Sequence, residues 1–278
     1  MTIPRLSASR YVQPLREGGS LPAVVDTEED GLYVVKFRGA GQGARVLVAE
    51  LIVGGLAVRL GLPTPDLALV NISERFGRSE PDPEIQELLR RSHGTNVGMR
   101  YLEGAFNFDP SAAGSLIPPE LAARIVWLDA LTTNPDRTHR NPNLMIWRHE
   151  PWLIDHGAAL YAHHDWSSVD GARTRTPFSL IRSHVLLSSA GSLAEADAES
   201  APRLSNDVIA EVIAAVPDDL LMNAESGSSD FASAKEARAR YARYLAERLA
   251  ARSAWLAAAE EAQQQLRIEL PQHLRARR

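Results

Sequence analysis

Two charged side chains interrupt apolar segments in the first third of the chain, and they restrict how it can fold. Lys36 lies within Leu32–Phe37, a β-branched and aromatic run that is typical of a strand. Glu50 lies within Arg45–Leu60, an apolar run that is typical of a helix ended by Gly61. A buried ammonium or carboxylate is costly without an opposite charge beside it. We therefore expect the strand and the helix to pack so that Lys36 and Glu50 form an ion pair, although a lysine on a half-exposed edge strand would need no partner.

The expected elements change in kind along the chain, from strands to helices. Alternation along the lysine strand places Leu32, Val34 and Lys36 on one face, and Tyr33 and Val35 on the other. This order predicts an α+β fold of two lobes, a β-rich lobe over residues 1–97 and a helical lobe over residues 98–278. The other expected elements are strands at Ala23–Asp26, Leu67–Ile72 and Thr95–Leu102, a short helix at Pro83–Arg91, a helix at Pro118–Thr132, a strand hairpin at Leu144–Trp147 and Trp152–Ile154, and helices at Ser179–Leu187, Ser205–Val216 and Phe231–Leu266, the last broken near Arg252.

Composition excludes several classes of function. The 278 residues are 45% hydrophobic and 23% charged, which is ordinary for a globular protein, and no apolar run reaches the roughly 18 residues of a membrane span. The first residues lack the apolar core of a signal peptide, so we expect a cytoplasmic protein without a membrane partner. The absence of cysteine excludes disulfides, thiolate nucleophiles and cysteine metal sites. A net charge of −5 argues against direct nucleic-acid binding.

The segment Asn134–Asn143, NPDRTHRNPN, and the following Trp152–Gly157, WLIDHG, carry the residues best suited to chemistry. Phosphoryl transfer requires one carboxylate at the attacking hydroxyl, and a second carboxylate and an amide oxygen that hold Mg²⁺ on the ATP phosphates. Asp136, Asn141 and Asp155 follow one another in the order and spacing found in protein kinases. Asn, Pro and Asp also favour plain turns, but an acidic residue directly after an apolar strand is expensive to bury without compensation. The pattern therefore predicts a Mg²⁺-dependent phosphotransferase.

Two glycine-containing loops are candidates for a phosphate cradle made of backbone N–H groups. Gly18, Gly19 and Ser20 precede the lysine strand, whereas Gly39–Gly43 follows it. Neither matches the GxxxxGK[ST] pattern. Because kinases place the glycine loop before the lysine strand, we favour Gly18–Ser20.

Taken together, these segments resemble the HipA-like kinases, in particular the short, stand-alone HipA-like kinase domain proteins of bacteria. The resemblance covers roughly residues 10–190. One departure from the usual kinase pattern is His156, which follows the second aspartate where most kinases have phenylalanine. The matching stretches are EGGS at Glu17–Ser20, YVVKF at Tyr33–Phe37, the helix at Ala49–Pro65, YLEG at Tyr101–Gly104, LDALTTNPDRTHRNPNLM at Leu128–Met145 and WLIDHGAAL at Trp152–Leu160.

The resemblance implies a fold related to protein kinases and phosphatidylinositol kinases, with a nucleotide-binding N-terminal lobe and a catalytic C-terminal lobe. It implies ATP and Mg²⁺ as cofactors and a Ser/Thr protein kinase acting on a protein substrate. A small-molecule or lipid-type kinase and a nucleotide-binding regulatory pseudokinase are the alternatives. The implied roles are contact with the ATP phosphates by Lys36, orientation of Lys36 by Glu50, base catalysis by Asp136, Mg²⁺ binding by Asn141 and Asp155, and adenine contact at a hinge that includes Met99, Tyr101 and Leu102.

Overall fold

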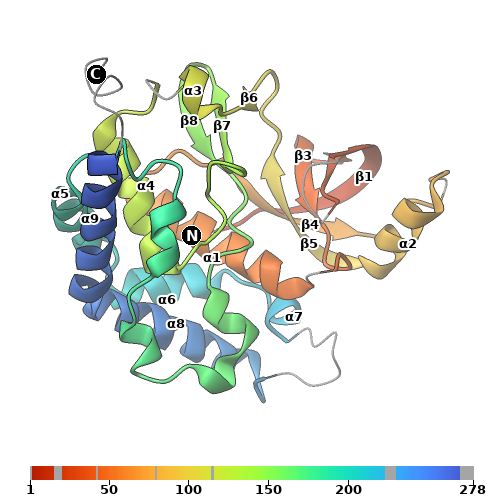
Figure 1. Cartoon of the computed structure of the whole chain (residues 1–278). Coiled ribbons are helices and arrows are strands. Elements are labelled where there is room, and N and C mark those ends of the chain that lie inside the picture. The colour runs from red at the N-terminus through yellow and green to blue at the C-terminus, as the bar shows by residue number, and fades with distance from the viewer. Residues whose placement is uncertain are drawn as a thin grey trace.

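A closed five-stranded barrel forms the N-terminal part of the protein (Figure 1). The computed structural model describes residues 2–15, 21–41, 43–78, 80–113, 116–222 and 230–269. Neighbouring strands are antiparallel except at the closure of the barrel, where the first strand runs parallel to the fourth. The strands follow the order β1-β2-β3-β5-β4 around the barrel and span Arg5–Pro14 (β1), Ala23–Thr27 (β2), Gly31–Lys36 (β3), Leu67–Ile72 (β4) and Gly94–Arg100 (β5).

The alternation expected for the lysine strand is present in β3. Tyr33 and Val35 are buried in the apolar interior of the barrel. Val34 and Lys36 face the opposite way and line a cleft outside the barrel. Across from β3, a Cβ atom on Gly98 of β5 would lie 2.9 Å from Val70 Cγ2, so the close approach of β4 and β5 requires a glycine there.

The sequence patterns did not predict β1. Its residues, RLSASRYVQP, lack a clear apolar alternation, and most of them are exposed or half-buried. The strand is held by pairing instead, since it lies antiparallel to β2 and parallel to β4 with Arg5 opposite Leu69. Such an edge-closing strand is specified by its two neighbours more than by its own apolar face.

Helix α1, Ala44–Leu60, lies between the barrel and the C-terminal helices (Figure 1). Every residue of the helix is buried except Arg45, Val58 and Arg59. Gly61 ends the helix in the left-handed conformation, with φ of 70°, and its N–H donates back to the last turn. The apolar run around Glu50 therefore forms the buried helix that was expected.

The C-terminal part contains a small antiparallel sheet and a group of helices around an apolar core shared with α1. None of the helices in the described ranges is long and apolar enough to cross a membrane. The remaining elements are α2 (Pro83–Arg91), β6 (Phe106–Asn107), α3 (Pro110–Ala113), α4 (Pro119–Thr132), β7 (Leu144–Trp147), β8 (Glu150–Leu153), the 3₁₀ turns η2 (Tyr161–His164), η3 (Trp166–Ser168), η4 (Arg173–Arg175) and η5 (Ser179–Ser183), α5 (Leu193–Ser200), η6 (Ala201–Arg203), α6 (Asn206–Ala214), α7 (Asp218–Leu221), α8 (Ala234–Ala250) and α9 (Arg252–Glu269).

The expected helix at Ser179–Leu187 is wrong. Only the 3₁₀ turn η5, Ser179–Ser183, forms there, and the following backbone pairs with a distant loop. His184 forms a bridge with Thr138, and the N–H of Val185 donates to the carbonyl of Arg137 at 3.0 Å. Most apolar residues of the segment are still buried. The segment therefore packs on the core through tertiary hydrogen bonds in place of helical ones.

The boundary expected between residues 97 and 98 falls within β5, and the division into two lobes with separate tasks stays a proposal. Two apolar cores exist, one inside the barrel and one among the helices. Helix α1 belongs to the second core although it precedes β4 and β5 in the chain. The long C-terminal helix breaks between Ala250 and Arg252, close to the position that the sequence indicated.

Candidate active site

A cleft of about 680 Å³ separates the barrel from the loop that follows α4 and from β7. Its barrel side includes Val34 and Lys36, and its opposite side includes Asn141 and Asp155. The volume lies within the roughly 300–1,000 Å³ range of small-molecule sites. Segments from both halves of the sequence therefore meet at one hollow that can hold a nucleotide.

Lys36 is bonded to two carboxylates at the floor of this cleft. Its Nζ atom donates to Oε1 of Glu50 in α1, and it lies 2.5 Å from Oδ1 of Asp155. The Lys36 and Glu50 side chains are buried, whereas the Asp155 side chain is 40% exposed. The ion pair expected between the strand and the helix is present, and it includes a third member that comes from the other side of the cleft.

Burial and neighbouring charges have opposite effects on the pKa values of this cluster. Burial alone would lower the pKa of Lys36, but Glu50 and Asp155 outweigh it and raise that pKa above its ordinary value. Burial raises the pKa of Glu50, and its second oxygen, Oε2, has no hydrogen-bond partner within the described chain. Asp155 is also desolvated, yet Lys36 lowers its pKa. One lysine therefore serves two carboxylates, and the cluster carries an excess of negative charge.

The turn after β8 brings Asp155 toward Lys36. Asp155 adopts the left-handed conformation with φ of 53°, which is uncommon for residues other than glycine but is more accessible to aspartate than to most. Gly157 then packs against α1, where an added Cβ would lie 2.5 Å from Val46 Cγ1 and 3.1 Å from Glu50 Oε1. The glycine of the Asp-His-Gly triplet is thus required for close packing of this turn on the helix that carries Glu50.

Asp136 lies beside the far wall of the cleft and is fixed by two amides. Its Oδ2 atom accepts hydrogen bonds from Nδ2 of Asn141 at 2.8 Å and from Nδ2 of Asn143 at 3.1 Å. Its backbone N–H donates to Oδ1 of Asn134 at 3.1 Å. Asn141 and Asn143 line the cleft, while Asp136 contacts them from the side. Because both amides use their nitrogen on Asp136, their carbonyl oxygens are left for another ligand.

The sequence comparison agrees with this arrangement. A family model described as HipA-like kinase matches residues 9–174, which is more than half of the chain. The chain belongs to the HipA-like kinase family. The match includes the strand of Lys36, the helix of Glu50, the loop of Asp136 and the turn of Asp155, so the geometry above is that of a HipA-like kinase that uses ATP. No curated protein sequence matches the chain.

The structural comparison shows the fold. The crystal structure of the Helicobacter pylori proinflammatory kinase CtkA is similar with a TM-score of 0.54, over 95% of this chain and 99% of that chain. The two sequences are 13% identical, so the likeness concerns the fold alone. The two-lobed, protein-kinase-like architecture expected from the sequence is confirmed for this HipA-like kinase.

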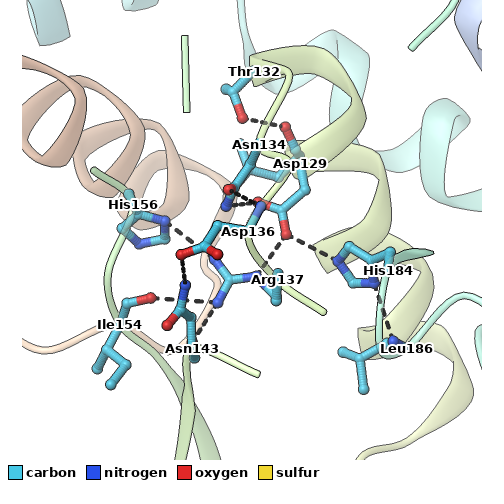
Figure 2. Close-up of polar contacts among 11 residues, drawn as sticks. Asp129, Thr132, Asn134, Asp136, Arg137, Asn143, Ile154, His156, His184 and Leu186 are labelled. Atoms are coloured by element: carbon cyan, nitrogen blue, oxygen red, sulfur yellow. Dashed lines mark hydrogen bonds and ion pairs between the residues drawn. The ribbon is translucent and has the colours of Figure 1, made fainter. Parts of the chain in front are cut away.

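A second charged cluster, drawn in Figure 2, lies behind the loop of Asp136, and its charged side chains are absent from the lining of the cleft. At its centre is Asp129 of α4, which is completely buried. Its Oδ2 atom accepts hydrogen bonds from Nε of Arg137 at 2.6 Å and from Nε2 of His184 at 2.9 Å. Its Oδ1 atom accepts from Nδ2 of Asn134 at 3.0 Å. Asp129 therefore joins the start of the loop and the segment around His184 to one helix.

The hydrogen bonds fix the tautomer of His184. Nδ1 of the ring accepts from the backbone N–H of Leu186 at 3.1 Å, so the ring proton is on Nε2 and is donated to Asp129. Burial lowers the pKa of His184 and favours this neutral form. The sequence patterns missed both Asp129 and His184. Asp129 carries the signal that revealed Glu50, an acidic residue in an apolar helix, whereas His184 carries none.

Arg137 connects this buried cluster with the strands that follow it. Its Nη1 atom donates to the carbonyl of Asn143, and to that of Ile154 at 3.4 Å. Its side chain is completely buried, so it neutralises Asp129 and does not reach the cleft. In Figure 2, Arg137 lies between His184 on one side and His156 on the other.

His156 takes the place of the usual kinase phenylalanine in this HipA-like kinase and is completely buried. Its Nδ1 atom lies 3.3 Å from Nη2 of Arg137, which can only donate, so the ring proton is on Nε2. Nε2 has no partner within the described chain. Burial and the Arg137 charge lower the pKa of His156 to about 3, and the neutral ring fills its position as a largely apolar side chain would.

The segment expected to form the hinge lines the cleft at Met99, Tyr101 and Leu102. Met99 pairs with Val34 of β3 and with β4, and the N–H of Tyr101 donates to the carbonyl of Leu32 at 3.0 Å. The N–H of Leu102 makes no hydrogen bond to any residue in the described ranges. Leu102 therefore has a backbone donor that is free within the described chain, at a position that lines the cleft.

The two candidate phosphate loops differ in what the structure says of them. Gly18, Gly19 and Ser20 lie outside the described residues, although Leu15 and Pro22, on either side of them, line the cleft. The described residues of Gly39–Gly43 are absent from the cleft lining. Gly39 packs instead against residues 91 and 92 at the end of α2, which explains its lack of a side chain.

The oxygen atoms at the cleft fit a magnesium ion bound together with phosphates. Asn141 offers an amide oxygen and Asp155 a carboxylate, which are the hard ligands that Mg²⁺ takes when substrate phosphates and water complete its shell. No group of three or more His, Cys, Asp or Glu residues within the described ranges could hold a metal by itself. This donor set therefore suits a metal that arrives with a nucleotide, and it suits a transition metal poorly.

Proposed function

We propose that this protein is an ATP- and Mg²⁺-dependent kinase that transfers the terminal phosphate of ATP to a Ser or Thr hydroxyl of a protein. The observation that supports the proposal most strongly is the convergence of Lys36, Asn141 and Asp155 on one cleft. These residues come from a strand, a loop and a turn that are far apart in sequence. Chance turns would not bring a buried lysine and an acidic turn to the same nucleotide-sized hollow.

Each residue has a defined task in this proposal. Lys36 contacts the ATP phosphates, and Glu50 holds Lys36 in place from α1. Leu102 donates its N–H to the edge of the adenine ring, while Met99 and Tyr101 cover the ring. Asn141 and Asp155 hold Mg²⁺, which neutralises phosphate charge and orients the transferred group.

Asp136 acts as the base. Its Oδ2 atom is occupied by two amides, and Oδ1 makes no hydrogen bond within the described chain, so Oδ1 is free to accept the proton of the acceptor hydroxyl. The bond between the γ-phosphorus and the β–γ bridging oxygen breaks, and a bond from the acceptor oxygen to the γ-phosphorus forms. ADP leaves with the bridging oxygen, and the hydroxyl proton goes to Asp136.

The Asp136→Asn variant tests the proposal directly, by incubation with ATP labelled at the γ-phosphate. We expect the variant to lose at least about 10³-fold in transfer rate, because the amide cannot accept the proton, while ATP binding measured by calorimetry is unchanged. The exposed Asp66→Asn is a matched control that should transfer label at the wild-type rate.

The location of the label identifies the acceptor. Label on protein Ser or Thr supports the proposal, and label on a small molecule or lipid head group would replace it with a kinase of another substrate class. ATP binding without any transfer, unchanged in Asp136→Asn, would identify a regulatory pseudokinase. Full activity of Asp136→Asn would exclude Asp136 as the base.

A further inference from the structure

Three basic side chains line the cleft within the described chain, and they differ in their partners. Lys36 is bonded to Glu50 and Asp155. Arg100 pairs with Asp30, and its Nε lies 3.6 Å from Asp66. Arg140 is exposed and has no hydrogen bond or ion pair to any part of the described chain. A cation in a cleft wall that no carboxylate neutralises is available for an anionic ligand.

The loop holds the backbone of Arg140 in a fixed position. The N–H of Thr138 donates to the carbonyl of Asn141 at 3.0 Å, and the N–H of Asn141 lies 3.3 Å from Oγ1 of Thr138, which closes a tight turn around residues 139 and 140. The Asn141 side chain is in turn bonded to Asp136 at 2.8 Å. The arginine thus stands beside the base and next to a metal ligand in the proposed function.

The other basic residues of the same loop cannot take this position. Arg137 is absent from the cleft lining, and its guanidinium is used by Asp129 and by two backbone carbonyls. His139 is absent from the cleft lining. Of the basic side chains in the loop, Arg140 is the one that contributes to the wall.

The excess of negative charge at the site favours a further, unpaired cation in the cleft wall. The carboxylates of Glu50, Asp136 and Asp155 outnumber the single ammonium of Lys36 on this side of the barrel, and a nucleoside triphosphate would add further negative charge. In phosphoryl transfer the developing charge spreads over the three peripheral oxygens of the transferred group, and a guanidinium can bind two of them at once. Lys36 is already shared between two carboxylates and cannot serve this purpose alone.

We propose that Arg140 binds the terminal phosphate of the nucleoside triphosphate and stabilises the group while it is transferred. The inference rests on the proposed function and adds to it a residue that distinguishes a triphosphate from a diphosphate. Because Arg140 is exposed and has no structural partner in the described chain, its removal leaves the fold intact. The transfer step is the one given above, in which ADP leaves and Asp136 takes the proton, and Arg140 neither gains nor loses a proton.

The test compares the binding of Mg²⁺-ADP with that of the Mg²⁺-bound β,γ-imido analogue of ATP, by calorimetry on the full chain. Wild type is expected to bind the analogue more tightly than ADP. Arg140→Ala should bind ADP as wild type does and lose about tenfold or more in affinity for the analogue. Arg140→Lys should lose less affinity, because lysine keeps the positive charge but lacks the planar guanidinium that can bind two phosphate oxygens. Arg148→Ala is the matched control, since Arg148 is exposed, lies over the ring of Trp147 and is absent from the cleft lining.

The rate of label transfer gives a second readout. We expect Arg140→Ala to reduce it about 10²-fold or more, in keeping with the removal of one charge-stabilising donor from a transition state. Equal affinity of Arg140→Ala and wild type for the analogue, with equal transfer rates, would overturn the role of Arg140 and leave the proposed function standing. Failure of wild type to bind either nucleotide would overturn the proposed function and the inference together.

Discussion

Within the described chain, one cluster of charged side chains lies behind the loop over residues 134–143 and another faces the cleft, and their charges are balanced differently. In the cluster behind the loop, both carboxylate oxygens of Asp129 are satisfied by Asn134, Arg137 and His184. The interaction with Arg137 and His184 lowers the pKa of Asp129 despite its burial. In the cluster facing the cleft, a single Lys36 serves two carboxylates, and one oxygen of Glu50 has no partner within the described chain.

The difference separates structural charges from functional ones. A buried polar group that is fully hydrogen-bonded holds segments together and has no capacity for a ligand. A cluster with excess charge and unused oxygens is incomplete by itself, and a cation or a cation-bound ligand would complete it. The cluster behind the loop should therefore determine stability, and the cluster in the cleft should determine binding.

Removal of the buried carboxylate should have the largest effect on stability. We expect Asp129→Ala to lower the free energy of unfolding by about 3–5 kcal/mol, because Arg137 would stay buried without its counter-charge. Asp155→Ala should change it by less than about 1 kcal/mol, since the Asp155 side chain is 40% exposed and Lys36 keeps Glu50. Urea denaturation of the two variants measures both values, and equal losses would remove the distinction between the clusters.

Nucleotide should stabilise the protein through the cleft-facing cluster. With Mg²⁺ and ATP at about 100 times the dissociation constant, we expect the free energy of unfolding to rise by about 2.7 kcal/mol. Asn141→Ala and Asp155→Ala should lose the part of this gain that depends on Mg²⁺, while ATP with a chelator gives the reference for each protein. A full Mg²⁺-dependent gain in Asp155→Ala would show that this carboxylate is not a metal ligand.

Acidification should weaken the fold through its buried neutral histidines. Burial lowers the pKa of His156 to about 3 and that of His163 well below its usual range, and it also lowers the pKa of His184. Below the unfolded pKa of about 6.5 the unfolded chain binds protons that the folded chain does not. The free energy of unfolding should therefore decrease by about 1.4 kcal/mol for each unit by which the pH is lowered, for each of His156 and His163.

A variant isolates one of these histidines. Between about pH 6 and pH 5, the free energy of unfolding of His163→Phe should fall less steeply on acidification than that of wild type, by about the contribution of one histidine. Denaturation curves at the two pH values give the slope. An unchanged slope in His163→Phe would mean that His163 titrates alike in the folded and unfolded chain.

The sequence predicted the cleft-facing cluster more readily than the one behind the loop, for a physical reason. A lone charge in an apolar strand or helix has a cost that is visible in the pattern, and this cost is what allowed Lys36 and Glu50 to be paired from the sequence alone. His184 has no such signature, because its partner lies 55 residues away and its own segment has the composition of a helix. Local patterns carry no information on which distant backbone a residue will pair with.

The elements of the fold also divide into those that the sequence patterns predicted and those that they did not. The buried helix α1 and the strands β3 and β4 follow from runs of apolar residues, and their expected bounds were close. Strand β1 is mixed in polarity and depends on pairing with β2 and β4, so composition did not reveal it. The roles of the site residues stay predictions until nucleotide binding and transfer are measured.

The position of α1 has a consequence for control. Arg59 at one end of the helix pairs with Glu211 of α6 at 3.0 Å, Arg45 at the other end pairs with Asp230, and almost the whole surface between them is covered. Outward rotation of this helix, which would withdraw Glu50 from its lysine, would have to expose the core that α1 shares with the C-terminal helices. In the proposed function, the packing of α1 therefore keeps Lys36 paired with Glu50, and we expect control of the kinase to act on access to the cleft.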